Sequence, residues 1–341
     1  MHLTLRTLLF TVLLAPAFTA LYTQTDAKLR YDYTRLDPLE DVAGEGWLKP
    51  AESFNRTRFY TSAGIGAGAY LGFGVGLYSI WYKGYELEGF HTFNDWPEWE
   101  QMDKVGHVFT AYFFNRSAFA GLRWAGVKRP AARYTALGVA NLLQATIETM
   151  DGFSSNWGFS LSDMGANLAG SLVFTVQDIL WREQRILIKV SNDFRPVPDV
   201  PVVRNDGTTG NLGYVVRERF GGNPFERFLK DYNTQTIWLS VNPAAFIPKS
   251  PLPQWLNIAV GYGVEDVYGA YGNVWKEDGV GFSYRPDDRR RQWFLSPDLY
   301  LSRIPTKKRW VRLALGILDF IKVPAPTLEY SRGTFRGRWF G

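Results

Sequence analysis

Apolar residues dominate one long segment near the start of the chain. Residues 59–82 contain no charged side chain and are flanked by Arg56 and Arg58 before them and by Lys83 after them. This length matches one crossing of a lipid bilayer. Glycine recurs at every fourth position, which on a helix forms a smooth stripe for close packing of another helix: Gly64, Gly68, Gly72 and Gly76. A glycine-rich strand is the alternative, but exposed glycine is costly in a helix, so we predict a helix buried in lipid or in a bundle.

Three later segments have the spacing and the end signals of helices. They cover residues 103–124, residues 134–150 and a third segment that begins after Ser160 or Ser162 and ends near 181. Pro130 stands close to the start of the second segment, where proline is tolerated, and either serine could cap the third. Their uncharged stretches are short, so we expect packing against the first helix rather than separate membrane crossings.

The pattern changes after residue 185. Residues 186–194 are typical of a strand, whereas 195–235 are rich in proline, glycine and charge and are predicted as loop. From 236 onward side chains alternate as in antiparallel strands, with Ile258, Val260, Tyr262 and Val264 on one face and Asn257, Ala259, Gly261 and Gly263 on the other. Residues 293–302 and 327–340 are also strand-like, and 310–323 have helical spacing. The predicted fold is α+β: a membrane-associated helical bundle of about four helices, followed by an antiparallel β-rich C-terminal part.

The first 20 residues have the features of a secretory signal. A short basic start precedes an apolar run at 8–14 and a group of small residues, so we expect cleavage after Ala17 or Ala20. An uncleaved anchor is the alternative, although the apolar run is short for a bilayer crossing. The predicted organisation is a signal peptide at 1–20, an extended lead-in at 21–55, a helical bundle with a polar core at 56–190, a linker at 191–235 and a β-rich region at 236–341.

Composition narrows the class of protein. The net charge of +5, from 38 Lys+Arg and 33 Asp+Glu, is too small and too scattered to indicate nucleic acid. The absence of cysteine excludes disulfides, thiolate metal sites and cysteine nucleophiles. Aromatic residues cluster at 81–99, and amphipathic rings of this kind collect at membrane–water boundaries. We therefore expect a Gram-negative envelope protein that faces the periplasm and contacts lipid of the inner or the outer membrane, with other envelope proteins as further candidate partners.

Polar residues interrupt the apolar faces of the three later helices. On each helix they share one face: Asp103, Lys104 and His107 on the first; Asn141, Gln144 and Glu148, followed by Asp151, on the second; and Asp163, Asn167 and Gly170, preceded by Ser160, on the third. If the three helices pack together, one histidine, several carboxylates, an amide and a lysine meet in one place.

Such a cluster allows three interpretations. His107 could act as an oriented general base with Glu148 or Asp163 as the acid, and with Asp103 and Lys104 completing the candidate catalytic set. The histidine and the carboxylates could instead hold a divalent metal ion, mostly through oxygen ligands. The third interpretation needs no ligand, because hydrogen bonds between buried polar groups fix the register of packed helices. Candidate binding residues are Asp151, Ser160 and Asn167, and the sequence identifies no cofactor.

The three motifs resemble a known family. The segments Asp103-Lys104-x-Gly106-His107, Glu148-x-x-Asp151-Gly152 and Gly158-Phe159-Ser160-x-x-Asp163-x-x-x-Asn167-x-x-Gly170 are similar to the uncharacterised envelope family typified by YfiM, described as predicted periplasmic lipoproteins. The resemblance covers roughly residues 56–190 and implies an envelope location and a polar helical core, without an established activity. A fainter likeness, to the VanZ-like membrane proteins, rests on their similar Asp-Lys-x-x-His helix. Because the sequence lacks cysteine, we do not expect the lipid anchor of a lipoprotein to carry over.

The leading expectation is an uncharacterised envelope protein with a structural or accessory role, whose polar His/Asp/Glu/Asn cluster holds the helices together. The alternative is an envelope hydrolase or transferase that acts on lipid or cell-wall material and uses this cluster as an acid–base or metal site. The sequence does not decide whether the protein is an enzyme. A pore-like component of the outer membrane would need more strands than the sequence indicates.

Overall fold

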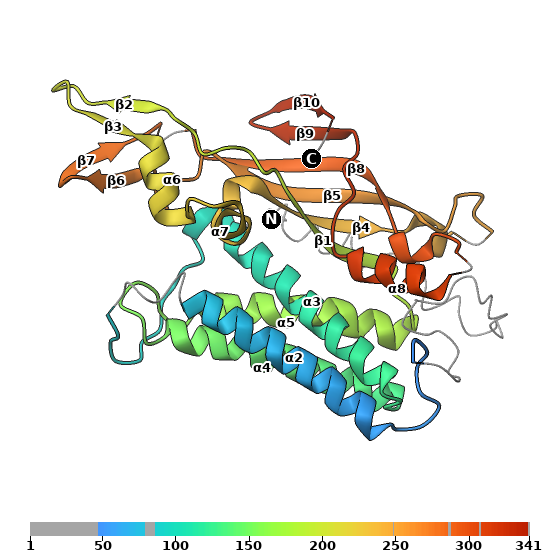
Figure 1. Cartoon of the computed structure of the whole chain (residues 1–341). Coiled ribbons are helices and arrows are strands. Elements are labelled where there is room, and N and C mark those ends of the chain that lie inside the picture. The colour runs from blue at the N-terminus through green and yellow to red at the C-terminus, as the bar shows by residue number, and fades with distance from the viewer. Residues whose placement is uncertain (1–46, 79–85, 248, 286–287, 307, 340–341) are drawn as a thin grey trace, which may run out of the picture.

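A computed structural model describes residues 47–78, 86–247, 249–285, 288–306 and 308–339. A bundle of four long helices forms one layer, and a six-stranded sheet rises beside it (Figure 1). The expected signal peptide and most of the expected lead-in lie outside the described residues, as does the start of the aromatic segment at 81–99.

The four bundle helices occur where the sequence predicts them. They are α2 (Arg56–Leu77), α3 (Met102–Trp124), α4 (Arg129–Asp151) and α5 (Leu161–Leu180), and a 3₁₀ turn, η4 (Glu98–Gln101), precedes α3. Side chains cap two of the N-termini, because the Asn55 side chain accepts from the Arg58 amide and the Ser160 side chain accepts from the Asp163 amide. Pro130 stands in the first turn of α4, where its missing amide hydrogen costs nothing.

The predicted membrane crossing at 59–82 is not borne out in its described part, which is helical as expected, and residues 79–82 lie outside the described residues. In the part of the chain that the structure describes, no helix combines the length and the apolar character that a crossing requires. Six glycines dilute the apolar character of α2. The glycine stripe does not receive another helix either, since a Cβ added at Gly64, Gly66, Gly68, Gly72, Gly74 or Gly76 would meet nothing within 4 Å.

The C-terminal part forms an antiparallel sheet, as predicted. Its six strands have the spatial order β1 (Ile186–Asn192), β4 (Gln235–Val241), β5 (Leu256–Glu265), β8 (Arg290–Leu299), β9 (Thr327–Ser331) and β10 (Thr334–Arg338). All neighbours in this order pair antiparallel. The α+β class is therefore confirmed.

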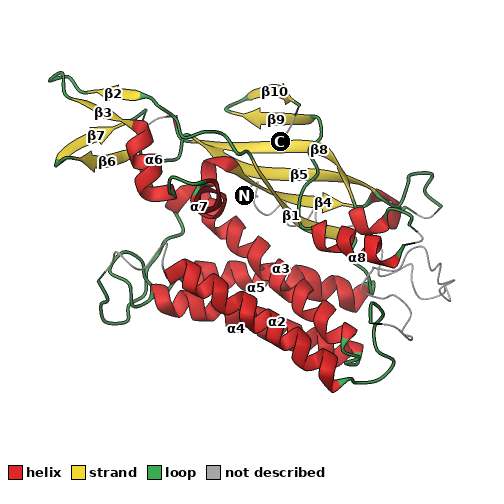
Figure 2. Cartoon of the chain, viewed as in Figure 1, coloured by secondary structure: helices red, strands yellow, loops and turns green. Residues whose placement is uncertain are grey.

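Smaller elements surround the sheet (Figure 2). The segment 195–235, expected as loop, contains the hairpin β2 (Pro201–Val203) and β3 (Thr209–Asn211) and the helices α6 (Leu212–Phe220) and α7 (Pro224–Lys230). A second hairpin pairs β6 (Val274–Glu277) with β7 (Val280–Ser283), and the helix predicted at 310–323 appears as α8 (Arg309–Leu318). The described residues thus hold seven α-helices, two more than the four bundle helices and the helix at 310–323 that the sequence predicts, because Asn side chains cap short helices inside the polar segment.

One apolar core joins the bundle to the sheet. Tyr112, Phe119 and Phe174 from α3 and α5 pack in the same cluster as Ile188 of β1 and Ile237 of β4. Met102, the first residue of α3, belongs to the same cluster, so the junction holds the start of α3 beside the sheet (Figure 1).

Gly170 lies where the backbone of α5 packs against the backbone of α3. A Cβ added there would stand 2.0 Å from the backbone oxygen of Val108, whereas one added at Gly165 of the same helix would meet nothing within 4 Å. We expect Gly170→Ala to destabilise the protein by about 1–3 kcal/mol, because backbone cannot move aside cheaply. Gly165→Ala is the matched control and should stabilise by up to about 1 kcal/mol, through the higher helix propensity of alanine. Urea denaturation of both variants tests this, and equal effects would show that the helices are not in contact at Gly170.

Candidate functional site

The polar faces of α3, α4 and α5 meet around one histidine. The Nε2 atom of His107 lies 3.8 Å from Asp103 Oδ1, 3.7 Å from Glu148 Oε1 and 3.8 Å from Asp163 Oδ1. These separations exceed hydrogen-bond length. They leave the ring nitrogen facing three carboxylates, one from each helix, and the His107 side chain remains 19% exposed.

A chain of amides fixes the orientation of the imidazole. His107 Nδ1 lies 3.0 Å from Asn167 Oδ1, and Gln144 Nε2 donates to the same oxygen at 2.7 Å. The carbonyl oxygen of Asn167 can only accept hydrogen bonds, so the ring must carry a proton on Nδ1 and donate it to this oxygen. Nε2 is then the ring atom that faces the carboxylates. Asn167 is fully buried and Gln144 nearly so, which holds both amides in place. Partners of this kind fix the tautomer of catalytic and metal-binding histidines.

Lys104 is the second cation of the cluster. Its Nζ atom lies 2.6 Å from Asp95, 2.8 Å from Asp103 and 2.7 Å from Asp163, and the side chain is 6% exposed. Asp95 also accepts hydrogen bonds from the hydroxyls of Ser160 and Ser162, at 2.6 Å each. The ammonium group therefore ties the segment before α3 to α3 itself and to α5.

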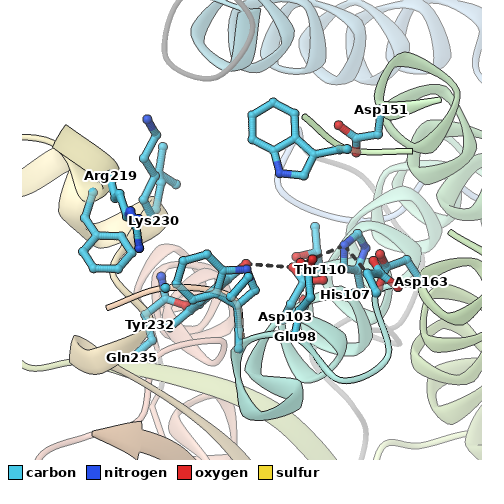
Figure 3. Close-up of a pocket in the computed structure, with 18 of the residues that line it drawn as sticks. Glu98, Asp103, His107, Thr110, Asp151, Asp163, Arg219, Lys230, Tyr232 and Gln235 are labelled. Atoms are coloured by element: carbon cyan, nitrogen blue, oxygen red, sulfur yellow. Dashed lines mark hydrogen bonds and ion pairs between the residues drawn. The ribbon is translucent and has the colours of Figure 1, made fainter. Parts of the chain in front are cut away.

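Part of the cluster lines a cavity of about 690 Å³ between the bundle and the sheet side of the molecule, namely Asp95, Asp103, His107, Gln144 and Asp163. Asp103, His107 and Asp163 stand on one wall, and Arg219 and Lys230 from α6 and α7 stand across the cavity (Figure 3). Apolar rings and chains complete the lining: Phe93, Trp99, Phe109, Ile147, Trp157 and Phe220. A mainly apolar cavity with a few convergent polar groups is the usual form of a ligand site.

Burial and neighbouring charges raise the pKa values of three groups in the site. Burial opposes the charged form of His107, but Asp103, Asp163 and Glu148 together raise its pKa to about 9. Burial raises the pKa of Glu148 to about 7, against the attraction of His107. Burial, together with the charge of Asp103, raises the pKa of Asp163 to about 8. The result is an acid and a base with pKa values on either side of neutral to mildly alkaline pH.

Negative groups outnumber positive ones in this cluster. Asp95, Asp103, Glu148 and Asp163 face only Lys104 and His107 among the contacts of the described residues. Glu148 Oε1 is buried and accepts no hydrogen bond from the described part of the chain. Asp103, His107 and Asp163 each offer one ligand atom, and these three atoms lie within 4.8 Å of one another. They are close enough to surround one metal ion.

The structure brings most of the sequence-predicted residues together, and their functional roles stay a prediction. Asp103, Lys104, His107, Glu148, Asp163 and Asn167 form the cluster, and Ser160 caps α5 beside it. Asp151 lines the cavity but stands apart from His107 (Figure 3). Asn141 bonds to Ser171 instead, at 2.9 Å.

Sequence reasoning missed two members of the site. Asp95 lies on the segment before α3 and contacts Lys104, and the hydroxyl of Tyr232 donates to Asp103 Oδ1 at 2.7 Å. Asp95 stands in a polar, aromatic segment, and a carboxylate in such a segment could have been recognised in the sequence as a candidate site residue. Tyr232 lies 129 residues from its partner along the chain, and no local pattern marks it.

Comparison with known proteins supports the resemblance that the motifs carry. Residues 88–177 match the family model described as "Predicted periplasmic lipoprotein (DUF2279)". This is the envelope family suspected from the motifs, and the matched range contains every residue of the cluster except Tyr232. The match supports a location in the Gram-negative envelope, facing the periplasm and associated with a membrane. The fainter likeness to VanZ-like proteins finds no support, and no curated protein and no solved structure matches the chain.

Proposed function

We propose that the protein is an envelope hydrolase or transferase that acts on lipid or cell-wall material, with the His107 cluster as its reaction centre. The observation that carries this proposal is one geometric arrangement. An imidazole fixed by Asn167 presents Nε2 to three carboxylates, and two of these, Asp103 and Asp163, line a 690 Å³ cavity together with His107. A cluster that only held helices together would have no need of a cavity in front of it.

In this proposal the pKa values decide which residue is the general acid and which is the general base. The assignment is the opposite of the one expected from the sequence. Glu148, with a pKa of about 7, accepts a proton from water or from an acceptor hydroxyl, whose oxygen then bonds to the carbonyl or phosphoryl centre. His107, with a pKa of about 9, carries a proton on Nε2 at neutral pH and donates it to the leaving oxygen or nitrogen as that bond breaks. The sequence suggested His107 as the base, and the three nearby carboxylates favour the acid role that we propose instead.

Replacing His107 tests this proposal. His107→Gln should reduce turnover about 10²–10⁴-fold, the usual contribution of a general acid. The assay incubates the pure protein with envelope lipid extract and with peptidoglycan, and follows released products by mass spectrometry. His91→Gln is the matched control, because His91 lies outside the cluster and its ring Nδ1 lies 3.2 Å from the carbonyl oxygen of Gly89.

The wild-type rate should follow a bell with limbs near pH 7 and pH 9, as Glu148 loses its proton and then His107 does. Undiminished turnover in folded His107→Gln would show that another group is the acid. If the wild-type protein turns over neither lipid nor peptidoglycan, the hydrolase proposal fails, and the cluster is a structural network.

A divalent cation is a second candidate for the same cluster. The surplus of carboxylates and the unsatisfied Glu148 Oε1 favour it, because a cation would balance the buried charge. Saturating Zn²⁺ or Mn²⁺ at about a hundred times the dissociation constant should then stabilise the fold by about 2.7 kcal/mol. Calorimetric melting with Zn²⁺, Mn²⁺, Mg²⁺ or Ca²⁺ measures this, and Asp163→Asn should abolish the shift while Asp193→Asn, on an exposed carboxylate, should keep it. Absence of a shift with all four ions excludes the cation and leaves the acid–base proposal standing.

A further inference from the structure

The six-stranded sheet carries large apolar side chains on a face that is only partly covered. At β1 and β4 this face packs on the helical bundle, through Ile188, Val190 and Ile237. Farther across the sheet the same face is exposed. Its side chains there are Ile258 (49% exposed), Val260 (46%), Trp293 (42%), Leu295 (49%), Leu328 (43%), Tyr330 (42%) and Phe335 (68%). A contiguous apolar surface of this kind marks a binding site.

The opposite face of the same strands is buried and polar. Asn257, Gln292, Ser296, Asp298 and Glu329 alternate with the apolar residues and are at most 4% exposed. The sequence predicted this alternation, but an ordinary water-exposed sheet would bury the other set. The sheet is therefore arranged with its apolar side outward, as in proteins whose solvent on that side is lipid.

The side chains on the exposed face form rows across the strands, as the strand register shows. Tyr262, Trp293, Tyr330 and Phe335 are successive cross-strand partners, with ring centroids 4.9 Å apart for Tyr262–Trp293 and for Tyr330–Phe335. The next row, two residues along each strand, is aliphatic: Val260, Leu295 and Leu328. Beyond it Ile258 pairs with Pro297. An aromatic row therefore borders an aliphatic area.

Charged side chains lie on the other side of the aromatic row. Arg291 precedes Trp293 on the same face of β8, and Arg332 follows Tyr330 in the turn between β9 and β10. Both arginine side chains are more than two-fifths exposed while they pair with Glu100 and Asp288, respectively. The other two arginines of the hairpin belong to the opposite face, because Arg336 is the cross-strand partner of Glu329 and Arg338 pairs with the carboxylate of Glu329. The order basic, aromatic, aliphatic is the order of headgroup, interface and hydrocarbon in a bilayer leaflet.

We propose that this face, formed by β5, β8, β9 and β10, docks on an anionic lipid membrane. The aliphatic rows enter the acyl region, the aromatic row lies at the interface, and the arginines meet anionic headgroups. A hollow of about 730 Å³ opens on the same face between Leu295, Leu328 and Trp339, with room for part of an acyl chain. A second copy of the chain is the other candidate occupant, but two such faces would bring their basic hairpins together. The proposal does not depend on the reaction proposed for the His107 cluster.

Because the chain lacks cysteine, a single reporter can be placed on this face. Leu295→Cys, labelled with an environment-sensitive fluorophore, should brighten several-fold and shift to the blue when vesicles of phosphatidylglycerol and phosphatidylethanolamine are added. Val203→Cys on β2, which is 65% exposed and outside the face, is the matched control and should not respond. If the protein floats with the vesicles but the fluorophore at position 295 neither brightens nor shifts to the blue, the proposal is overturned. Brightening that depends on protein concentration without vesicles overturns it too, and assigns the face to a second copy.

A double variant tests the energetic contribution. Leu295→Asp with Leu328→Asp should lower the vesicle partition coefficient at least tenfold, because it puts two charges among the acyl chains. Val203→Asp should leave the coefficient unchanged. Both leucines are more than two-fifths exposed, so an unchanged melting temperature will show that the double variant is folded. An unchanged partition coefficient in the folded double variant contradicts the proposal.

Discussion

Replacing Lys104 with methionine is expected to destabilise the protein by about 3–5 kcal/mol, the usual cost of removing one partner from a buried ion pair. The ammonium group contacts Asp95, Asp103 and Asp163 within 2.8 Å, and its side chain is 6% exposed. Without it, these carboxylates are left among other acids with only His107 nearby. Methionine is only one atom shorter than lysine, so the loss reports mainly the charge rather than a cavity.

The loss of stability in Lys104→Met should become smaller as the pH falls. Burial opposes the ionised form of Asp95, but hydrogen bonds that include one from Lys104 hold its pKa well below the ordinary value of 3.8. A carboxylate with a lowered folded-state pKa stabilises the protein above its unfolded pKa, and this stability is lost as pH falls through the folded value. The gap between wild type and Lys104→Met is therefore largest at neutral pH and narrows as the aspartates take up protons in acid.

Urea denaturation at pH 7 and at pH 3 measures this gap, with Lys276→Met on an exposed strand position as the control. A loss below about 1 kcal/mol, the range of exposed ion pairs, would contradict the buried arrangement of Lys104. A gap that widens in acid would contradict the assignment of the charges.

The helical half of the molecule could be predicted because its signals are local. Asp103, Lys104 and His107 lie within one turn and a half of a single helix, so their common face follows from helical geometry alone. The same holds for Gln144 with Glu148, and for Asp163 with Asn167. That three such faces meet was a hypothesis, and the Gly170 contact with Val108 shows how α5 comes close enough to α3.

Contacts between distant segments could not be predicted in this way. Tyr232 reaches Asp103 only because the core between α3 and the sheet brings η5 (Tyr232–Thr234) beside the bundle. The apolar run at 59–82 correctly predicted a helix, but the membrane crossing predicted from it is not borne out in the described residues. That prediction used only the length of the run and its lack of charge, and it did not take into account that glycine is only weakly hydrophobic. In the sheet, period two separated the faces correctly, but it does not say which face is buried.

Asp298 should have an effect as large as that of Lys104, in the buried polar face of the sheet. Its side chain is fully buried, 2.9 Å from Lys189 Nζ and 4.0 Å from Lys322 Nζ, and it accepts from Ser240 Oγ at 2.6 Å. Asp298→Asn leaves two buried ammonium groups without their anion, and we expect a loss of about 3–5 kcal/mol at pH 7. Asp278→Asn in the exposed turn between β6 and β7 is the control.

The pH dependence should be opposite to that of Lys104→Met. Burial lowers the pKa of Lys322 to about 8 even with Asp298 in place. The unfolded state therefore binds more protons than the folded state between about 8 and the ordinary 10.5, and stability rises with pH across that window. Removing Asp298 extends the window to lower pH, so the gap between wild type and Asp298→Asn should narrow from pH 7 to pH 9, where the gap of Lys104→Met stays wide. Parallel pH profiles for the two variants would mean that the acid-rich cluster beside His107 and the lysine-rich cluster beneath the sheet do not carry the charges assigned to them.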